Sequence, residues 1–206
     1  MATLVAPPKP PVTGHGGGYG GDGPGGRDER ALAIRRYKTG TWLGLGAVVM
    51  LFAAFTSAYV VRQGVSSDWR PTRLPSILWV STAVIVASSL TFERARRDKQ
   101  SALLWLTATS VLGVVFLAGQ YVAWQQLRAA GVFLASNPSS SFFYLLTGAH
   151  GAHIVGGILA LFYVVGKAWT VERWVNRQAA VEATALYWHF MDGLWVYLFL
   201  LLKVGR

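Results

Sequence analysis

Residues 142–166 read FFYLLTGAHGAHIVGGILALFYVVG, a stretch without a single Asp, Glu, Lys or Arg. A helix needs about 20 apolar residues to cross the hydrocarbon core of a bilayer, and this stretch is long enough to do so. Its apolar residues fall on most sides of a helix instead of along one stripe, which favours contact with lipid and neighbouring helices over a soluble core. The stretch therefore predicts a membrane-spanning helix.

Four further stretches have the same character, and the overall composition agrees with them. They cover residues 41–61, 75–92, 101–127 and 183–202, the last interrupted by one acid, Asp192. The 206 residues are 53% hydrophobic and 14% charged, whereas soluble domains average about 25% charged residues. We therefore predict an all-α fold in which residues 37–206 form a polytopic membrane bundle of five transmembrane helices.

The N-terminal segment, residues 1–36, is rich in Gly and Pro and contains the run TGHGGGYGGDGPGG at positions 13–26. Such a run buries too little surface to offset the entropy lost on ordering. The segment is predicted to be a disordered cytoplasmic tail.

The basic residues predict how the bundle is oriented. Lys and Arg number 19 against 9 Asp and Glu, a net charge of +10, and basic loops are retained on the cytoplasmic side. With the N-terminus inside, 13 of the 19 lie on inner segments and six on outer ones, which favours an inside N-terminus and an outside C-terminus.

No basic run is long enough to form a soluble nucleic-acid-binding face, so nucleic acid is not an expected partner.

Cofactor chemistry is narrowed by the absence of cysteine, which excludes a disulfide framework, Cys-ligated zinc and iron–sulfur clusters. His150 and His153 lie three residues apart, on one face of the predicted fourth span. With His189 as a third ligand they could bind a metal or haem, since imidazole suits iron, copper and zinc. Alternatively they hydrogen-bond across to the last span. We favour hydrogen bonding, because a bis-histidyl haem would have to pair one of them with His189.

The last span places an acid and an imidazole three residues apart, at His189 and Asp192. Such a pair can share a proton, which lowers the cost of placing either group in hydrocarbon. We expect Asp192 to bond His189 or a neighbouring histidine. The pair is either a structural link between helices or a proton-transfer element, and the first interpretation is preferred because few other acids cross the membrane.

The last span closely resembles the last-helix signature of subunit III of haem-copper (cytochrome c) oxidases, through Glu182, the run YWHFMD at 187–192, and Trp195. TGAHGAH at 147–153 resembles that family's paired-histidine segment, and Gln120 with Trp124 four residues later is also similar. The resemblance covers about residues 36–204. Family members commonly have seven helices, and this chain matches the last five.

The resemblance implies a non-redox accessory subunit of a terminal oxidase in the bacterial inner (plasma) membrane. Haem and copper are then expected only in partner subunits, with subunit I as the contact, subunit II in the same complex, and phospholipid bound to this chain. No residue of this chain is expected to be catalytic or to bind a metal. The residues implied to make structural, proton or lipid contacts are His150, His153, Glu182, Tyr187, Trp188, His189, Asp192, Trp195, Gln120 and Lys167.

Two positions depart from the family pattern, and they leave room for other functions. Val48 and Ala123 stand where the family has carboxylates, so a mechanism that needs those acids is not available here. A subunit III-like partner of nitric oxide reductase or of a quinol oxidase is the alternative function. A small transporter is less favoured, since no internal repeat is visible.

Overall fold

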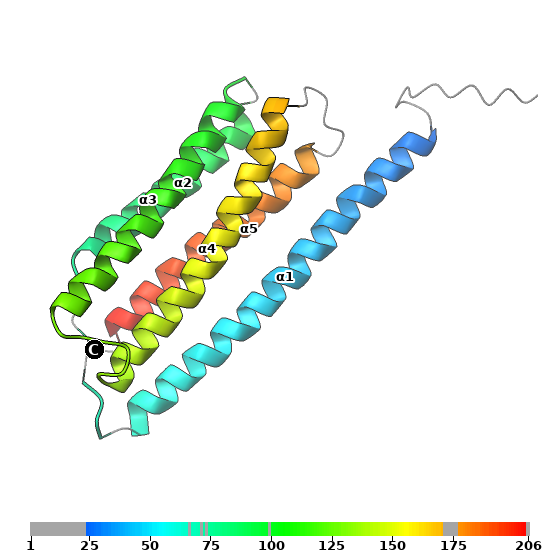
Figure 1. The fold of residues 1–206 in the computed structure, drawn as a ribbon. Helices are drawn as coiled ribbons and strands as arrows, with labels where there is room; N and C mark the ends of the chain where they lie inside the picture. Colours follow the sequence, from blue (N-terminus) through cyan, green and yellow to red (C-terminus); the bar gives the residue numbers. More distant parts are fainter. Residues whose placement is uncertain are drawn as a thin grey trace, which may run out of the picture.

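The computed structural model describes residues 24–65, 67–70, 72, 74–98, 100–170 and 177–204. Within these ranges helices are joined by turns and irregular connections, and there is no strand (Figure 1). The helices are α1 (Pro24–Val65), α2 (Ile77–Arg97), α3 (Ala102–Ala129), α4 (Pro138–Thr170) and α5 (Arg177–Val204).

Each of the five helices contains a segment long and apolar enough to cross a membrane. The segments are Lys38–Val65, Ile77–Arg97, Ala102–Ala129, Pro138–Lys167 and Ala180–Val204. They coincide with the five predicted stretches and extend them by a few residues at most ends. The prediction of an all-α bundle of five membrane helices is confirmed.

The first helix begins earlier than the sequence predicted, because α1 starts at Pro24, inside the segment expected to be disordered. Residues 27–38 read RDERALAIRRYK, and Ala, Leu, Arg and Glu in this run are good helix formers. A proline also suits the first turn of a helix, where its missing N–H has no partner to lose. The disorder predicted for residues 1–23 lies outside the described residues.

The helices run alternately up and down the bundle in three layers (Figure 1). α2 and α3 form a closely packed hairpin on one side, and α4 and α5 lie in the middle. α1 lies on the other side, where its described residues contact α4 and α5 but neither α2 nor α3. The middle pair therefore joins the two outer layers.

Small residues on α3 make room for its neighbours, α2 directly and the Trp188 side chain of α5. At Gly119, a Cβ would meet the Ser81 side chain of α2, and at Gly113 it would lie 2.7 Å from the Trp188 ring of α5. Thr91 and Thr109 also join α2 to α3 through a 2.9 Å hydrogen bond between their hydroxyls. Close backbone approach and interhelical hydrogen bonds are the main sources of helix association in lipid.

The α3–α4 connection has ordered ends that fix where α4 begins. Gly131 has a positive φ of 76°, a conformation that glycine adopts at little cost after a helix. Asn137 then accepts a 3.0 Å bond from the Ser140 backbone N–H, and the Ser140 hydroxyl receives the Asn137 N–H at 3.2 Å. This reciprocal cap starts α4 at Pro138.

Candidate functional site

The predicted polar residues of α4 and α5 lie at the centre of the bundle. His150 is fully buried, with its ring 5.2 Å from the Trp195 ring and 5.9 Å from the Phe116 ring, measured between centroids. Neither of its ring nitrogens has a hydrogen-bond partner in the described part of the chain. An apolar aromatic cage therefore surrounds the imidazole.

His153 is linked to α5 in a different way from the one predicted. Its Nδ1 lies 2.7 Å from the Ala149 carbonyl of its own helix, and its ring packs 5.7 Å from Phe52 of α1. The Tyr187 hydroxyl of α5 donates a 2.9 Å bond to the His153 backbone carbonyl. The cross-helix bond expected from the imidazoles is thus made by the backbone, because the ring is taken up by the preceding turn.

His189 points toward α2. Its Nδ1 lies 2.5 Å from the Ser89 hydroxyl, and its Nε2 lies 3.9 Å from the nearer oxygen of Glu93. Glu93 in turn forms ion pairs with Arg96 at 2.9 Å and with Arg97 at 2.8 Å. His189 therefore lies between a hydroxyl inside the bundle and charged groups at the end of α2.

Asp192 is buried, with 5% of its surface exposed, and neither carboxyl oxygen has a hydrogen-bond partner among the described residues. The Ser89 hydroxyl approaches the carboxyl without meeting hydrogen-bond geometry. The expected bond between Asp192 and a histidine is therefore not formed. The physical reason is competition, because Ser89 from α2 bonds the imidazole with which Asp192 was expected to share a proton.

The two predicted residues of α3, Trp124 and Gln120, differ in whether their side chains are hydrogen-bonded. Trp124 donates a 3.1 Å bond to the Thr147 hydroxyl of α4. Gln120, one turn earlier, is buried, and both of its side-chain amide atoms lack a partner among the described residues, as does the Ser81 hydroxyl of α2. The centre of the bundle thus holds several polar groups whose bonding capacity is unused.

Two buried tryptophans join α5 to α2. The Trp188 indole N–H donates to the Ser88 hydroxyl at 2.9 Å, and the Trp195 indole N–H donates to the Thr82 hydroxyl at 3.0 Å. Ser88, Ser89 and Thr82 were not among the predicted site residues. Their recurrence in an otherwise apolar stretch was the available signal, because such hydroxyls commonly bond across membrane helices.

The remaining predicted residues lie away from this centre. Lys167 places its ammonium 6.0 Å from the Tyr163 ring centroid near the end of α4. Glu182 is partly buried in the first turns of α5. Val48 and Ala123, the two departures from the family pattern, are both buried in the apolar core. Apolar packing occupies the places where carboxylates were expected from the resemblance.

The histidines do not form a ligand set. No cluster of three or more His, Cys, Asp or Glu residues suited to a metal ion occurs within the described ranges. His189 contacts α2, whereas His153 and His150 lie against Phe52, and His150 also lies against Phe116 and Trp195. The three-histidine arrangement considered from the sequence is not assembled in this fold.

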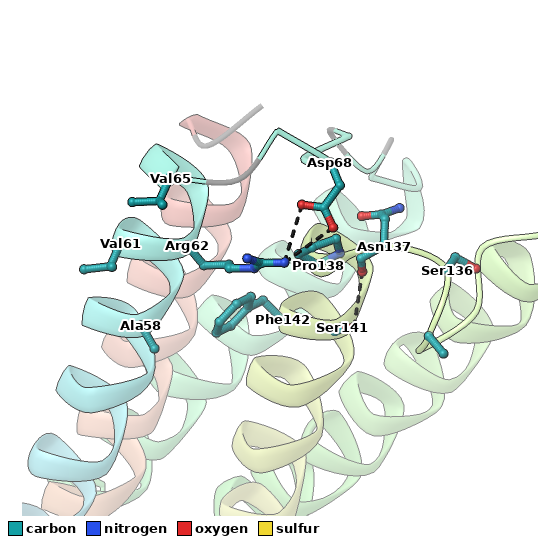
Figure 2. Close-up of a pocket in the computed structure, with 11 residues that line it drawn as sticks. Ala58, Val61, Arg62, Val65, Asp68, Ser136, Asn137, Pro138, Ser141 and Phe142 are labelled. Atoms are coloured by element: carbon teal, nitrogen blue, oxygen red, sulfur yellow. Dashed lines mark hydrogen bonds and ion pairs between the residues drawn. The ribbon is translucent and has the colours of Figure 1, made fainter.

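A cavity opens at the end of the bundle where α1 ends and α4 begins. Its volume is about 810 Å³. Figure 2 shows the Arg62 guanidinium reaching from α1 toward the Asp68 carboxylate, 3.4 Å away, in the α1–α2 connection. Apolar side chains and small polar ones share the wall, among them Ala58, Val61, Phe142, Asn137 and Ser141.

Comparison with known proteins identifies the relatives of this chain. The sequence profile of the family described as cytochrome c oxidase subunit III matches residues 39–204. The chain is 34% identical over 170 residues to a probable cytochrome c oxidase subunit 3 of Nocardia farcinica, covering 78% of this chain and 83% of that protein. It is 31% identical over 180 residues to cytochrome c oxidase subunit 3 of Synechocystis, covering 79% and 72% respectively.

A third relative differs in its stated electron donor. The chain is 30% identical over 169 residues to the cytochrome bo(3) ubiquinol oxidase subunit 3 of Pseudomonas aeruginosa, covering 78% of this chain and 80% of that protein.

Proposed function

The chain belongs to the cytochrome c oxidase subunit III family and is a subunit of a haem-copper oxidase; from this premise we propose that it packs on the catalytic subunit I and binds phospholipid. In this role it holds no redox group, and it supports assembly and proton uptake by its partner. The observation that carries the proposal is the extent of the family match, because residues 39–204 cover the five membrane spans except for Lys38.

The bonds within the bundle support a scaffolding role for the aromatic site residues. Tyr187, Trp188 and Trp195 each donate a hydrogen bond from α5 to a neighbouring helix. Trp188 and Trp195 are fully buried. Together with the His150 ring, they fix the relative positions of α2, α4 and α5, so the surface offered to a partner subunit is rigid.

Lipid contact is supported by cations at the helix ends. Lys203 lies 4.5 Å from the Trp79 ring centroid and Lys167 lies 6.0 Å from that of Tyr163. Lys and Trp or Tyr are the residues that anchor helices at the headgroup level. We assign Lys167 and Lys203 to headgroup contacts at opposite ends of the bundle.

The proposed location is the bacterial plasma membrane, with the N-terminus in the cytoplasm. The named relatives are bacterial, and the distribution of basic residues supports this orientation. Either cytochrome c or a quinol is the electron donor of the complex. The cytochrome c type is preferred, since the relatives from Nocardia farcinica and Synechocystis both bear that name.

Purification of the tagged full-length chain in mild detergent tests the proposal. We expect a haem-copper subunit to co-purify in equal amount, with haem absorbance that follows this partner and disappears when the chain is purified alone. Mass analysis identifies the partner, and a quinol oxidase subunit would favour the second donor. Recovery with a nitric oxide reductase, or without any haem-copper subunit, would refute the proposal.

A further inference from the structure

A line of polar groups leads from the end of α2 into the centre of the bundle. It begins at Glu93, whose side chain is 33% exposed, and continues to His189, whose side chain is also 33% exposed, at 3.9 Å. His189 Nδ1 then lies 2.5 Å from the Ser89 hydroxyl, and the buried Asp192 carboxyl follows His189 by three residues, about one turn, on α5. Glu93 belongs to a charged cluster with Arg96 and Arg97 at the end of α2, His189 is partly exposed beside it, and Asp192 is enclosed.

Asp192 is the group in this line whose bonding is incomplete. Both of its carboxyl oxygens are buried and have no hydrogen-bond partner in the described structure. An ionised carboxylate in such surroundings is costly, so the neutral acid is the form that the site accommodates. Any proton that Asp192 binds or releases must therefore pass through the polar groups that lead to it.

From this arrangement we propose that Asp192 is an internal proton-binding site that exchanges protons with water at the α2 end of the bundle, through Ser89 and His189. The proposal goes beyond the scaffolding function and does not depend on which oxidase the chain joins. It assigns a purpose to Ser89 and His189 that packing alone does not explain, because their mutual bond leaves Asp192 without one.

The transfer balances as a chain of hydrogen-bond exchanges. A proton from hydronium at the α2 end binds Nε2 of a neutral His189 that carries hydrogen on Nδ1, and the O–H bond that breaks leaves a water molecule. For the transfer the Ser89 hydroxyl turns to hydrogen-bond an Asp192 carboxylate oxygen. The Nδ1 proton then passes to the Ser89 oxygen as the Ser89 hydroxyl proton passes to Asp192. One N–H bond forms and one breaks, Ser89 ends as it began, and one O–H bond forms on Asp192. His189 is left neutral in its other tautomer.

The other ionisable groups near this line come from two neighbouring helices. α2 contributes Glu93 with Arg96 and Arg97, which hold a charged cluster at its end. α4 contributes His150 and His153. α1 contributes none over residues 41–58, and α3 contributes none over residues 102–120. Apart from the two α4 histidines, the charged groups therefore lie at the α2 end, where the proposed route opens.

Infrared difference spectroscopy on the full-length chain in lipid nanodiscs tests the proposal. We expect a protonated-carboxyl C=O band that is lost in Asp192→Asn, and that shifts when H₂O is replaced by D₂O. Ser89→Ala and His189→Phe should each slow this isotope shift at least tenfold. Ser89→Thr, which keeps the hydroxyl, should restore the rate.

Ser110→Ala is the matched control, because the Ser110 hydroxyl is buried and, among the described residues, bonds only the Leu106 carbonyl of its own helix. It should leave the exchange rate unchanged. Absence of a band that Asp192→Asn removes would overturn the proposal. So would an unchanged exchange rate in both Ser89→Ala and His189→Phe. The two substitutions remove different links, so misfolding of one variant leaves the other as the deciding measurement.

Discussion

Gly113 shows how a single missing side chain determines helix packing. A Cβ at this position would lie 2.7 Å from the Trp188 ring and 3.3 Å from Ile158. Trp188 is fully buried and bonded to Ser88, so it has no room to move. We expect Gly113→Ala to lower the free energy of unfolding by about 1–3 kcal/mol through overpacking, measured by denaturant titration in mixed micelles.

Gly151 is the control for this substitution, because nothing lies within 4 Å of the position that its Cβ would take. Gly151→Ala should leave stability unchanged or raise it slightly, since alanine is the better helix former. Equal destabilisation by both substitutions would show that the close contact at Gly113 is not what limits packing there.

The bond between Trp188 and Ser88 is a second residue-scale test. Its partners lie on α5 and α2, and both are buried. A double-mutant cycle with Trp188→Phe and Ser88→Ala should give a coupling energy of about 0.6 kcal/mol, the average for such bonds in membrane proteins. A coupling energy indistinguishable from zero would show that the tryptophan acts by packing alone.

The sequence placed the site residues on the correct helices but not with their partners. Helical spacing showed that His189 and Asp192 share a face of α5, because that relation is local. It could not show that Ser89 of α2 would compete for the imidazole, since this depends on the rotation and height of a neighbouring helix. Likewise the residue facing His153 was Tyr187, which bonds its backbone carbonyl and not its ring.

At the scale of elements, Asp98 orders the connection that leads from α2 into α3. Its carboxylate accepts the backbone N–H of Ser101 at 3.3 Å and that of Gln100 at 3.0 Å. These bonds, that of Ser101 foremost, lower the pKa of Asp98 below its ordinary value. A lowered folded-state pKa gives stability that is present above the pKa of the unfolded chain and is lost as the pH falls through the folded value.

We therefore expect amide hydrogen exchange at Gln100 and Ser101 to accelerate relative to intrinsic rates when the pH is lowered through the acidic range. Asp98→Ala should abolish this pH dependence and leave the start of α3 frayed at every pH, while Asp98→Asn should keep part of the protection because the amide oxygen still accepts. Protection in Asp98→Ala that matches the parent protein would contradict the role of Asp98 in ordering the connection.

The boundaries of the elements were predictable only where hydropathy changes sharply. Four spans follow from long runs without charge and the fifth from a run with one acid, Asp192, because a lipid-embedded helix must be mostly apolar. The start of α1 at Pro24 does not follow from hydropathy. There the helix extends through RDERALAIRRYK because these residues have high helix propensity. A Gly-rich run lies directly before this segment, so hydropathy does not mark the boundary.

At the scale of the whole molecule, α1 is attached through one narrow stripe. Its buried apolar side chains are Leu45, Val48, Phe52 and Tyr59, while Trp42, Met50 and Val61 are exposed. The sequence predicted five spans but not this layering, because every span is apolar on most of its sides. Only the polar and small residues distinguish one helix neighbour from another.

The stripe gives a prediction for the attachment of α1. Phe52 is 2% exposed and packs against Phe55, His150 and His153. Phe52→Ala should loosen α1 from α4 and α5 while leaving the α2–α3 hairpin intact. Spin labels at exposed Val61 and Leu145 should then report a broadened distance distribution, whereas labels on α2 and α3 should not. Met50→Ala, on the exposed face, is the control and should change neither distribution.

The orientation of the whole bundle is tested by two positions that one helix separates. Arg97 ends α2 and Arg128 lies near the end of α3, so α3 carries the chain from one end of the bundle to the other between them (Figure 1). The chain has no cysteine, so Arg97→Cys and Arg128→Cys each introduce one unique thiol. Loss of the exposed Arg97–Glu93 ion pair costs little stability.

Because 13 of the 19 basic residues lie on the Arg97 side, an impermeant thiol reagent should label the Arg97→Cys variant only from the cytoplasm and the Arg128→Cys variant only from outside. The reverse pattern would overturn the orientation, and labelling of both variants from one side would contradict α3 as a membrane span.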